Sequence, residues 1–101
     1  MAIEAWLGRN NTVEIELYDN AGLLINHSLI TRMLIVLGTI TLDSNSEPSA
    51  FVFTNPSKAV FLPSESLVLT AGYYTSKIIT YDSTNTKGLV WNGRDIIVRQ
   101  V

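Results

Sequence analysis

The sequence of 101 residues contains no cysteine and a single histidine, His27. Without cysteine the chain has no disulfides, no thiolate metal ligands and no thiol redox chemistry. A protein zinc site takes three or four nitrogen and sulfur ligands as a rule, so one histidine does not supply such a site. We therefore expect no metal site, and we interpret His27, which lies between Asn26 and Ser28, as a solvated loop residue.

Charged residues are also scarce. They make up 16% of the chain, below the roughly 25% typical of soluble domains. The net charge is −2, and the seven Lys and Arg residues are scattered. This pattern disfavours nucleic-acid binding, because affinity for phosphates comes from clustered basic residues. Hydrophobic residues make up 47% of the chain, and a small domain has a large surface for its volume. We therefore expect some apolar side chains to face a partner.

Catalytic and cofactor motifs are absent, including nucleophile elbows and glycine-rich phosphate loops. Glu14 and Glu16 share one face of a strand. Paired carboxylates can hydrolyse glycosides, but these two fit the solvated face of an amphipathic strand better. The acidic loops at 43–47 and 82–85 lack the glycine and spacing of an EF-hand, which leaves a weak calcium site as an alternative. We expect no enzymatic activity, no catalytic residues and no cofactor.

Long hydrophobic runs are missing as well. The most apolar run, from Met33 to Leu37, is far shorter than the ~18 residues of a membrane-spanning helix. Residues 1–6 have neither the basic region nor the apolar region of a signal peptide. We expect a chain that is made in the cytoplasm, begins near Met1 and does not cross a membrane.

Short apolar and β-branched segments are what the sequence does contain. Residues 12–18 alternate between apolar and polar side chains, as a half-buried strand does. Polar turn residues separate these segments at intervals of about 8–12 residues, which is typical of a sandwich or barrel. The expected strands are 12–18, 23–25 (a strand or an extended link), 29–37, 39–42, 50–53, 59–62, 67–69, 73–81, 89–91 and 96–99. We predict one domain over residues 1–101, an all-β, immunoglobulin-like antiparallel β-sandwich of about seven to nine short strands.

Glycines suggest how some of these strands connect. A helix over 29–37 is possible from its Leu and Met content, but Gly38 ends the run and 39–42 alternates strictly, so we predict strands with a bulge or tight bend at Gly38. The continuous apolar run at 33–37 predicts burial on both faces or at an interface. Asn92-Gly93 is typical of a two-residue hairpin turn between the last two strands.

We predict structural roles for three residues of the C-terminal half, Gly72, Tyr74 and Trp91. Ala71-Gly72 precedes Tyr74, as in the tyrosine corner of immunoglobulin-like sandwiches, where the hydroxyl bonds to upstream backbone. The alternative is an ordinary strand tyrosine with its hydroxyl in water. Trp91 is expected in the core, and Trp6 at the rim of the core or in an interface.

The C-terminal third combines four short patterns: Leu-x-Ala-Gly-x-Tyr at 69–74, Tyr-Asp at 81–82, Gly-x-x-Trp at 88–91 and an Ile/Val strand at 96–98. This combination resembles the end of small immunoglobulin-like domains in tailed-bacteriophage virion proteins. The segment from Ile30 to Ser44 is similar to the Thr-Arg-x-x-Leu-x-x-Gly-x-x-x-Asp-Ser pattern of the same domains.

The resemblance implies a non-enzymatic structural protein of the virion, such as a capsid decoration or cement protein, or an accessory component of the neck, tail or baseplate. Its expected partners are other virion proteins and further copies of itself. The alternative is a carbohydrate- or host-surface-binding module. The final strand, 95–101, is expected to pair with a neighbouring edge. The candidate interface residues are Trp6, Tyr73, Tyr81, Ile97 and Arg99.

Overall fold

The computed structural model describes residues 3–64 and 69–101. Within these ranges the chain is all-β, with ten strands and two single-turn 3-10 helices, so the predicted fold class is confirmed and the strand count is slightly higher than predicted. The predicted strand at 67–69 lies largely outside the described residues. The elements are β1 (Ile3–Trp6), β2 (Val13–Ile15), η1 (His27–Leu29), β3 (Arg32–Leu37), β4 (Ile40–Asp43), η2 (Pro48–Ala50), β5 (Phe51–Val52), β6 (Ala59–Phe61), β7 (Gly72–Tyr74), β8 (Ser76–Tyr81), β9 (Leu89–Asn92) and β10 (Ile96–Arg99).

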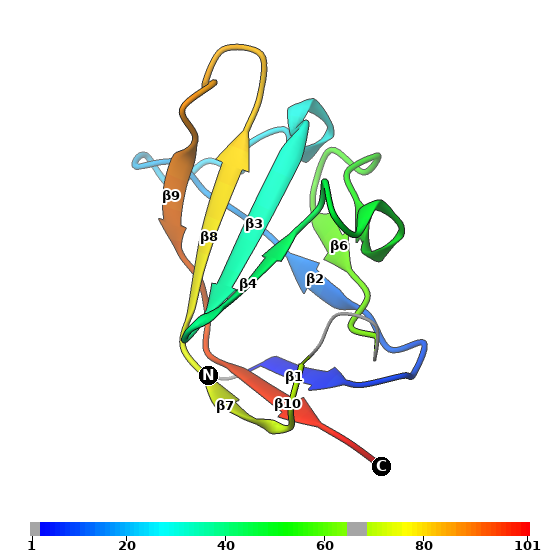
Figure 1. The fold of residues 1–101 in the computed structure, drawn as a ribbon. Helices are drawn as coiled ribbons and strands as arrows, with labels where there is room; N and C mark the ends of the chain where they lie inside the picture. The colour runs from blue at the N-terminus through cyan, green and yellow to red at the C-terminus, as the bar shows by residue number, and fades with distance from the viewer. Residues whose placement is uncertain (1–2, 65–68) are drawn as a thin grey trace.

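The strands form three sheets, in the orders β4–β3–β8–β9, β1–β10–β7 and β2–β6–β5. Figure 1 shows the four-stranded sheet in front of β2 and β6, with β1, β7 and β10 at its lower end. All paired strands are antiparallel except β1 and β10, which run parallel with Ile3 opposite Ile96. The sequence pattern does not predict β1, because four residues are too few to show a clear alternation.

Two of the sheets join end to end into one twisted layer, because β8 continues β7 and β10 continues β9. One residue separates β7 from β8, whereas residues 93–95 separate β9 from β10. The pairs that flank this junction are Tyr74 with Ile96 and Lys77 with Asn92. Two residues of one strand therefore face three of the other, which is a β-bulge.

This bulge corrects the predicted hairpin at Asn92-Gly93. The Gly93 N–H donates to the Ser76 carbonyl at 3.1 Å, and the Ser76 hydroxyl donates to the Arg94 carbonyl at 2.5 Å. A Cβ atom on Gly93 would lie 2.2 Å from the Ser76 Oγ, so the glycine permits a close approach of two strands. The prediction was wrong because Asn-Gly marks local turn chemistry, whereas this glycine serves a contact with a distant strand.

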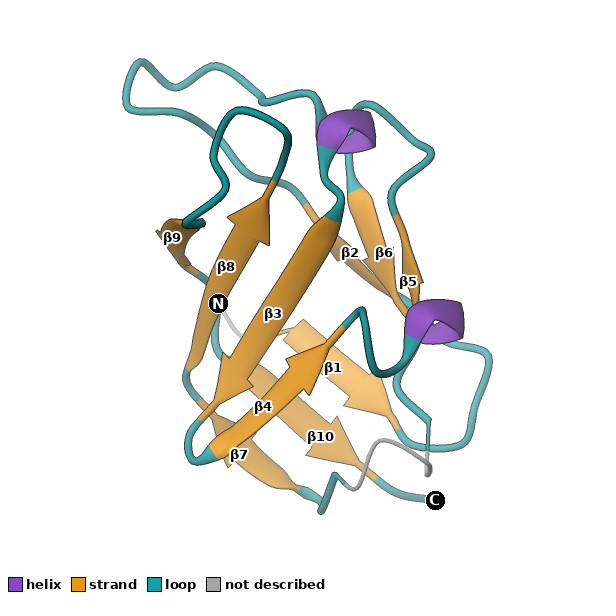
Figure 2. Cartoon of the chain, turned by 45° about the horizontal axis from the view of Figure 1, so that its top comes forward, coloured by secondary structure: helices purple, strands orange, loops and turns teal. Residues whose placement is uncertain are grey.

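The hydrophobic core lies between the joined layer and the β2–β6–β5 sheet (Figure 2). From β3, the side chains of Met33, Ile35 and Leu37 point inward and are fully buried. Val13 of β2 and Phe61 of β6 meet them from the other layer. This period-two alternation is what a strand with one buried face requires.

The β3–β4 hairpin explains Gly38 and the long apolar run before it. Leu37 pairs with Ile40, so residues 38 and 39 form a two-residue turn, and Gly38 has a φ of +60°. Tight hairpin turns of this length favour positive φ, so the glycine makes the predicted tight bend. Leu34 and Val36 of the same run lie on the outer face, where they are half-buried.

The hydroxyl of Tyr74 donates to the backbone carbonyl of Thr70 at 2.7 Å, and it also lies 2.9 Å from the Thr70 side chain. This is the hydrogen bond of a tyrosine corner. The bond ties the end of β7, at Tyr74, to the segment that leads into the strand. Gly72 has no positive φ, and a Cβ there would make only ordinary contacts with the Tyr74 ring, at 3.7 Å or more.

His27 is fully buried, which corrects its interpretation as a solvated loop residue. The Leu17 N–H donates to His27 Nε2 at 3.0 Å, so that nitrogen carries no proton, and Nδ1 lies 3.3 Å from the Pro56 carbonyl. The imidazole therefore links three segments that are distant in sequence. The neighbouring Asn26 and Ser28 are exposed, and their polarity hides the burial of the residue between them.

The final strand is also placed differently from the expectation. β10 is the central strand of its sheet, with β1 on one side and β7 on the other. Its backbone over Ile96–Arg99 is therefore occupied on both edges, and it cannot pair with a neighbouring molecule there. The predicted strand at 23–25 forms a single bridge, between Tyr18 and Leu24.

Gly88 and Gly72 offer a matched test of which glycine the fold needs. Gly88 has a φ of +89°, and an added Cβ would lie 2.8 Å from Ile79 and 3.0 Å from Tyr81. We predict that Gly88→Ala lowers the free energy of unfolding by about 1–3 kcal/mol, whereas Gly72→Ala changes it by less than about 0.5 kcal/mol. Urea denaturation measures both. An equal change in the free energy of unfolding in the two variants would contradict the conclusion that the fold requires a glycine at position 88.

Tyr74→Phe tests the corner hydrogen bond. Removing the hydroxyl deletes one donor to the Thr70 carbonyl and leaves the ring packing in place. We predict a loss of about 1 kcal/mol in the free energy of unfolding. Tyr18→Phe is the control, because the Tyr18 side chain is exposed and its hydroxyl makes, among the described residues, a single long contact of 3.4 Å with Glu16. A Tyr74→Phe protein as stable as the control variant would refute the importance of the corner.

Candidate protein-binding surfaces

Four of the five candidate interface residues share the outer face of the β1–β10–β7 sheet. The pairing places Trp6 opposite Arg99, and Ile97 opposite Tyr73. The alternate residues of the same strands, such as Val98, point into the core. Tyr73 is 63% exposed, whereas Trp6 and Ile97 are partly buried. We call these four residues together with Glu4 the lower face.

Polar contacts within the chain engage most of the lower face. Arg99 pairs with Glu4 at 2.5 Å, and its guanidinium lies 5.9 Å from the centre of the Trp6 ring. The Tyr73 hydroxyl donates to Asp95 at 2.5 Å, and this bond raises the pKa of Tyr73 above its ordinary value. The aromatic rings of this face are therefore held by charged neighbours of the same chain.

The fifth candidate, Tyr81, lies elsewhere. It ends β8 in the four-stranded sheet and pairs with Arg32 of β3, whose guanidinium is 5.2 Å from the centre of the Tyr81 ring. The carbohydrate-binding alternative expects Trp6, Tyr73 and Tyr81 to line up beside one another, and in the structure they do not.

Trp91 was predicted to lie in the core. Its side chain packs against the hydrophobic core, and its indole N–H donates to Thr80 at 3.0 Å.

An apolar row crosses the outer face of the four-stranded sheet. Leu34 of β3 pairs with Ile79 of β8, which in turn pairs with Val90 of β9. Val90 is 66% exposed, and Leu34 and Ile79 are half-buried. Val36 extends the row along β3, where its partner on β8 is the charged Lys77. We call Leu34, Val36, Ile79 and Val90 the apolar face.

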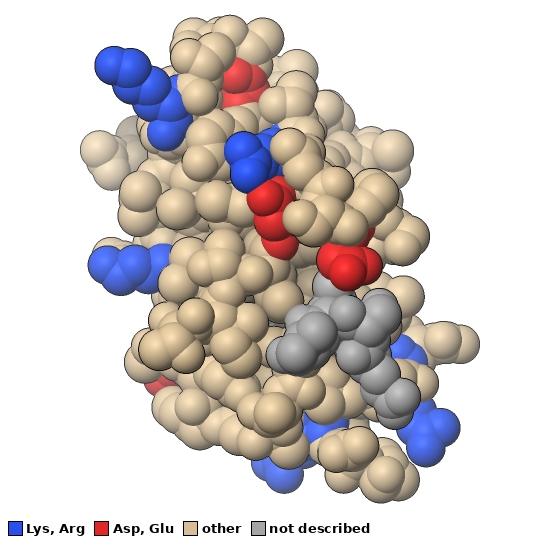
Figure 3. All heavy atoms as spheres, viewed as in Figure 1, with Lys and Arg blue, Asp and Glu red and all other residues tan. Residues whose placement is uncertain are grey.

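This apolar face is unusual for a sheet layer that meets water. A solvated sheet face normally carries polar side chains in alternation with the buried ones. Figure 3 shows that uncharged atoms cover most of this side of the molecule, with the charged groups in separate spots. The sequence indicated two of its four residues, Leu34 and Val36, because the run 33–37 lacks polar residues. It missed Ile79 and Val90, since neither segment is apolar throughout.

One ion pair borders the apolar face. The Arg32 guanidinium donates to both oxygens of Asp43, at 3.1 and 2.6 Å, across the β3–β4 hairpin. The hydrogen bond from Arg32 holds the pKa of Asp43 below its ordinary value, and the Asn45 N–H at 2.9 Å adds to this effect. Together with Lys77 of β8, which pairs with Val36 and is exposed on the same outer face, the pair makes a charged rim around the apolar face.

The two acidic loops considered for calcium use their oxygens within the chain. Asp43 is engaged by Arg32, and Asp82 accepts bonds from the Thr84 and Asn85 N–H groups and from the Asn85 side chain. These bonds lower the pKa of Asp82. Over residues 3–64 and 69–101, no group of three or more His, Asp or Glu side chains is placed to hold a metal ion. In the same ranges no helix is long and apolar enough to span a bilayer.

The Arg32–Asp43 pair predicts a dependence of stability on acid. Because the folded pKa of Asp43 lies below its unfolded value of about 3.9, the pair stabilises the fold above that value, and the contribution is lost as pH falls through the folded pKa. We predict that Asp43→Asn is less stable than the wild type at pH 7 and that the gap narrows as pH falls below about 4. Urea midpoints across a pH series measure this, and a constant gap would contradict it.

Comparison of the chain with protein-family models, with curated proteins and with solved structures finds no match.

Proposed function

We propose that this chain is a non-enzymatic structural subunit of a tailed-bacteriophage particle, of the decoration, neck, tail or baseplate kind, which binds neighbouring subunits and further copies of itself. The observation that carries protein binding is the apolar face, where Leu34, Ile79 and Val90 form a continuous row on the outside of the sandwich. The virion location is supported by the sequence resemblance over the C-terminal third.

Exposed apolar area supplies the driving force for this binding. Apolar side chains in water cost free energy in proportion to their exposed area, at roughly 25 cal/mol per Å². Large exposed apolar patches on small domains mark interaction surfaces more often than they are neutral. The apolar face lies on hydrogen-bonded strands and has a polar rim at Arg32, Asp43 and Lys77. An apolar centre with a polar rim is the usual composition of a protein interface.

Carbohydrate binding is less well supported. The lower face has two aromatic residues, Trp6 and Tyr73, but they lie on opposite edge strands with β10 between them. The nearby carboxylates of Glu4 and Asp95 already bond to side chains of the same chain. A sugar would therefore have to displace these contacts before it could form hydrogen bonds.

Val90→Lys and Val52→Lys form a matched test. Both valines are exposed, Val90 on the apolar face and Val52 (44% exposed) on β5 in the opposite layer. We predict that the wild type self-associates, that Val90→Lys weakens association at least tenfold (about 1.4 kcal/mol) and that Val52→Lys leaves it unchanged. A charge that becomes buried in an apolar contact must be desolvated, which is the physical reason.

Light scattering across a concentration series measures the association, with urea denaturation to establish that each variant is folded. A wild type that stays monomeric at every concentration and binds immobilised glycans saturably would contradict the proposal and favour the carbohydrate alternative. Equal weakening by Val90→Lys and Val52→Lys would show that charge alone, and not the apolar face, controls association.

A further inference from the structure

One side of the sandwich is open between β2 and the β9–β10 junction. β2 pairs with β6 alone, so within the described ranges no strand lies along its other edge. In the described part of the chain, the facing strand β9 likewise pairs with β8 alone. Further along this side β1 closes the gap, because it pairs with β10 and its Ile3 N–H donates to the Asp95 carbonyl at 2.8 Å. The opening therefore ends where β1 begins.

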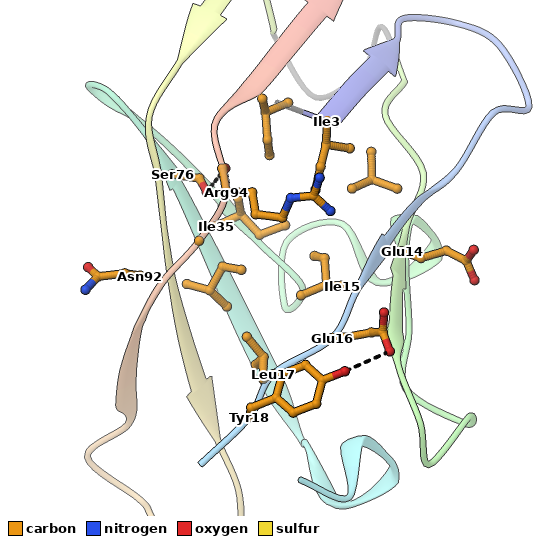
Figure 4. A pocket seen from close by; sticks show the side chains of 14 residues that line it. Ile3, Glu14, Ile15, Glu16, Leu17, Tyr18, Ile35, Ser76, Asn92 and Arg94 are labelled. Atoms are coloured by element: carbon orange, nitrogen blue, oxygen red, sulfur yellow. Dashed lines mark hydrogen bonds between the residues drawn. The ribbon is translucent and has the colours of Figure 1, made fainter. Parts of the chain in front are cut away.

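A cavity of about 190 Å³ lies in this opening. Its floor is apolar and reaches the core, and Arg94 extends from the bulge across its mouth toward Ile3 (Figure 4). A dry cavity of about 150 Å³ in another protein holds a benzene molecule, so this space is large enough for one aliphatic side chain. The buried floor residues are Val13, Ile15, Ile35, Ile78 and Ile96.

The unpaired edge of β2 has a defined side-chain pattern. Val13 and Ile15 are buried, whereas Glu14 and the following Glu16 are exposed on the other face. The open edge ends before Leu17, whose N–H donates to His27 and whose carbonyl accepts from the Ile25 N–H. Figure 4 shows Glu14 pointing away from the cavity. On its paired edge, Glu14 meets Lys58, which forms an ion pair with it. A strand paired with the open edge would place its alternating side chains beside two rows, the buried aliphatic side chains and the exposed glutamates. Lys or Arg side chains beside the glutamates would be favourable, because their charges are opposite.

We infer that the open edge of β2 accepts an extended segment of a partner protein in which aliphatic residues alternate with Lys or Arg. Its backbone pairs with the unpaired N–H and C=O groups of β2, one aliphatic side chain enters the cavity, and its cations lie beside Glu14 and Glu16. We call this site the β2 groove. It uses the strand-addition mode of recognition, in which backbone bonds give affinity and side-chain pockets give specificity.

The occupant is a different protein and not a second copy of this chain. The seven Lys and Arg residues of this sequence are all at least five positions apart. No segment of it therefore places two cations at alternate positions beside Glu14 and Glu16. The β2 groove is also separate from the apolar face, which lies on the outside of the other layer. The inference thus extends the proposed function without depending on it.

Titration of the isotope-labelled full chain with three end-blocked hexapeptides tests the β2 groove. The peptides alternate Val with Lys, Val with Glu, and Ser with Lys. We expect the Val-Lys peptide to bind saturably and shift the backbone amide resonances of 13–17 and 92–94, with slower hydrogen exchange in β2. The Val-Glu and Ser-Lys peptides should bind at least tenfold more weakly, because one lacks the cations and the other lacks the aliphatic anchor.

Variants complete the test. Glu16→Lys should weaken binding of the Val-Lys peptide at least tenfold, whereas Glu47→Lys, at an acidic residue that makes no capping bond to η2, should leave it unchanged. Val90→Lys should also leave it unchanged, which separates this result from that of the proposed function. The inference is overturned by an absence of saturable binding at millimolar peptide, by equal binding of the Ser-Lys peptide, or by shifts confined to other strands.

Discussion

The contact between Gly93 and Ser76 is the constraint on which the rest of the fold depends. Two hydrogen bonds, from the Gly93 N–H to the Ser76 carbonyl and from the Ser76 hydroxyl to the Arg94 carbonyl, hold three residues of one strand against two of the other. The bulge lets one long strand pair take part in two sheets, with β3 and β4 beside it at one end and β1 at the other. A side chain at Gly93 would separate the strands, and both sheets would lose their common centre.

The same junction decides which residues face outward. Beyond the bulge the alternation resumes, so that Ile96 and Val98 are buried and Ile97 faces out. On the other side of the bulge, Val90 faces out. The lower face and the apolar face are therefore two parts of one outer surface that differ in chemistry. Charged groups hold the aromatic rings of the first, whereas in the second an apolar row lies between the charged groups of Arg32, Asp43 and Lys77.

Sequence reasoning succeeded where a local pattern is sufficient. The alternation at 12–18 predicted β2, and Gly38 after an apolar run predicted a tight bend. It grouped Trp6, Tyr73, Ile97 and Arg99 as interface candidates, but their common face depends on the parallel pairing of β1 with β10, which no local pattern encodes. Asn92-Gly93 and His27 misled for one reason: each owes its conformation or burial to a contact with a distant segment, and its sequence neighbours give no sign of that contact. The β2 groove was equally hidden, because an unpaired edge is a property of the sheet order.

The parallel pairing of β1 and β10 has a mechanical consequence. Because the two strands run in the same direction, their hydrogen bonds lie across the line that joins the start of β1 at Ile3 to the end of β10 at Arg99. A force that pulls these two points apart loads all the bonds of the pair together in shear, and the Leu7 N–H bond to the Arg99 carbonyl shares the load. Antiparallel end strands pulled from one end would instead open one bond at a time. The geometry gives the domain resistance to tension applied between Ile3 and Arg99, along the direction of β1 and β10.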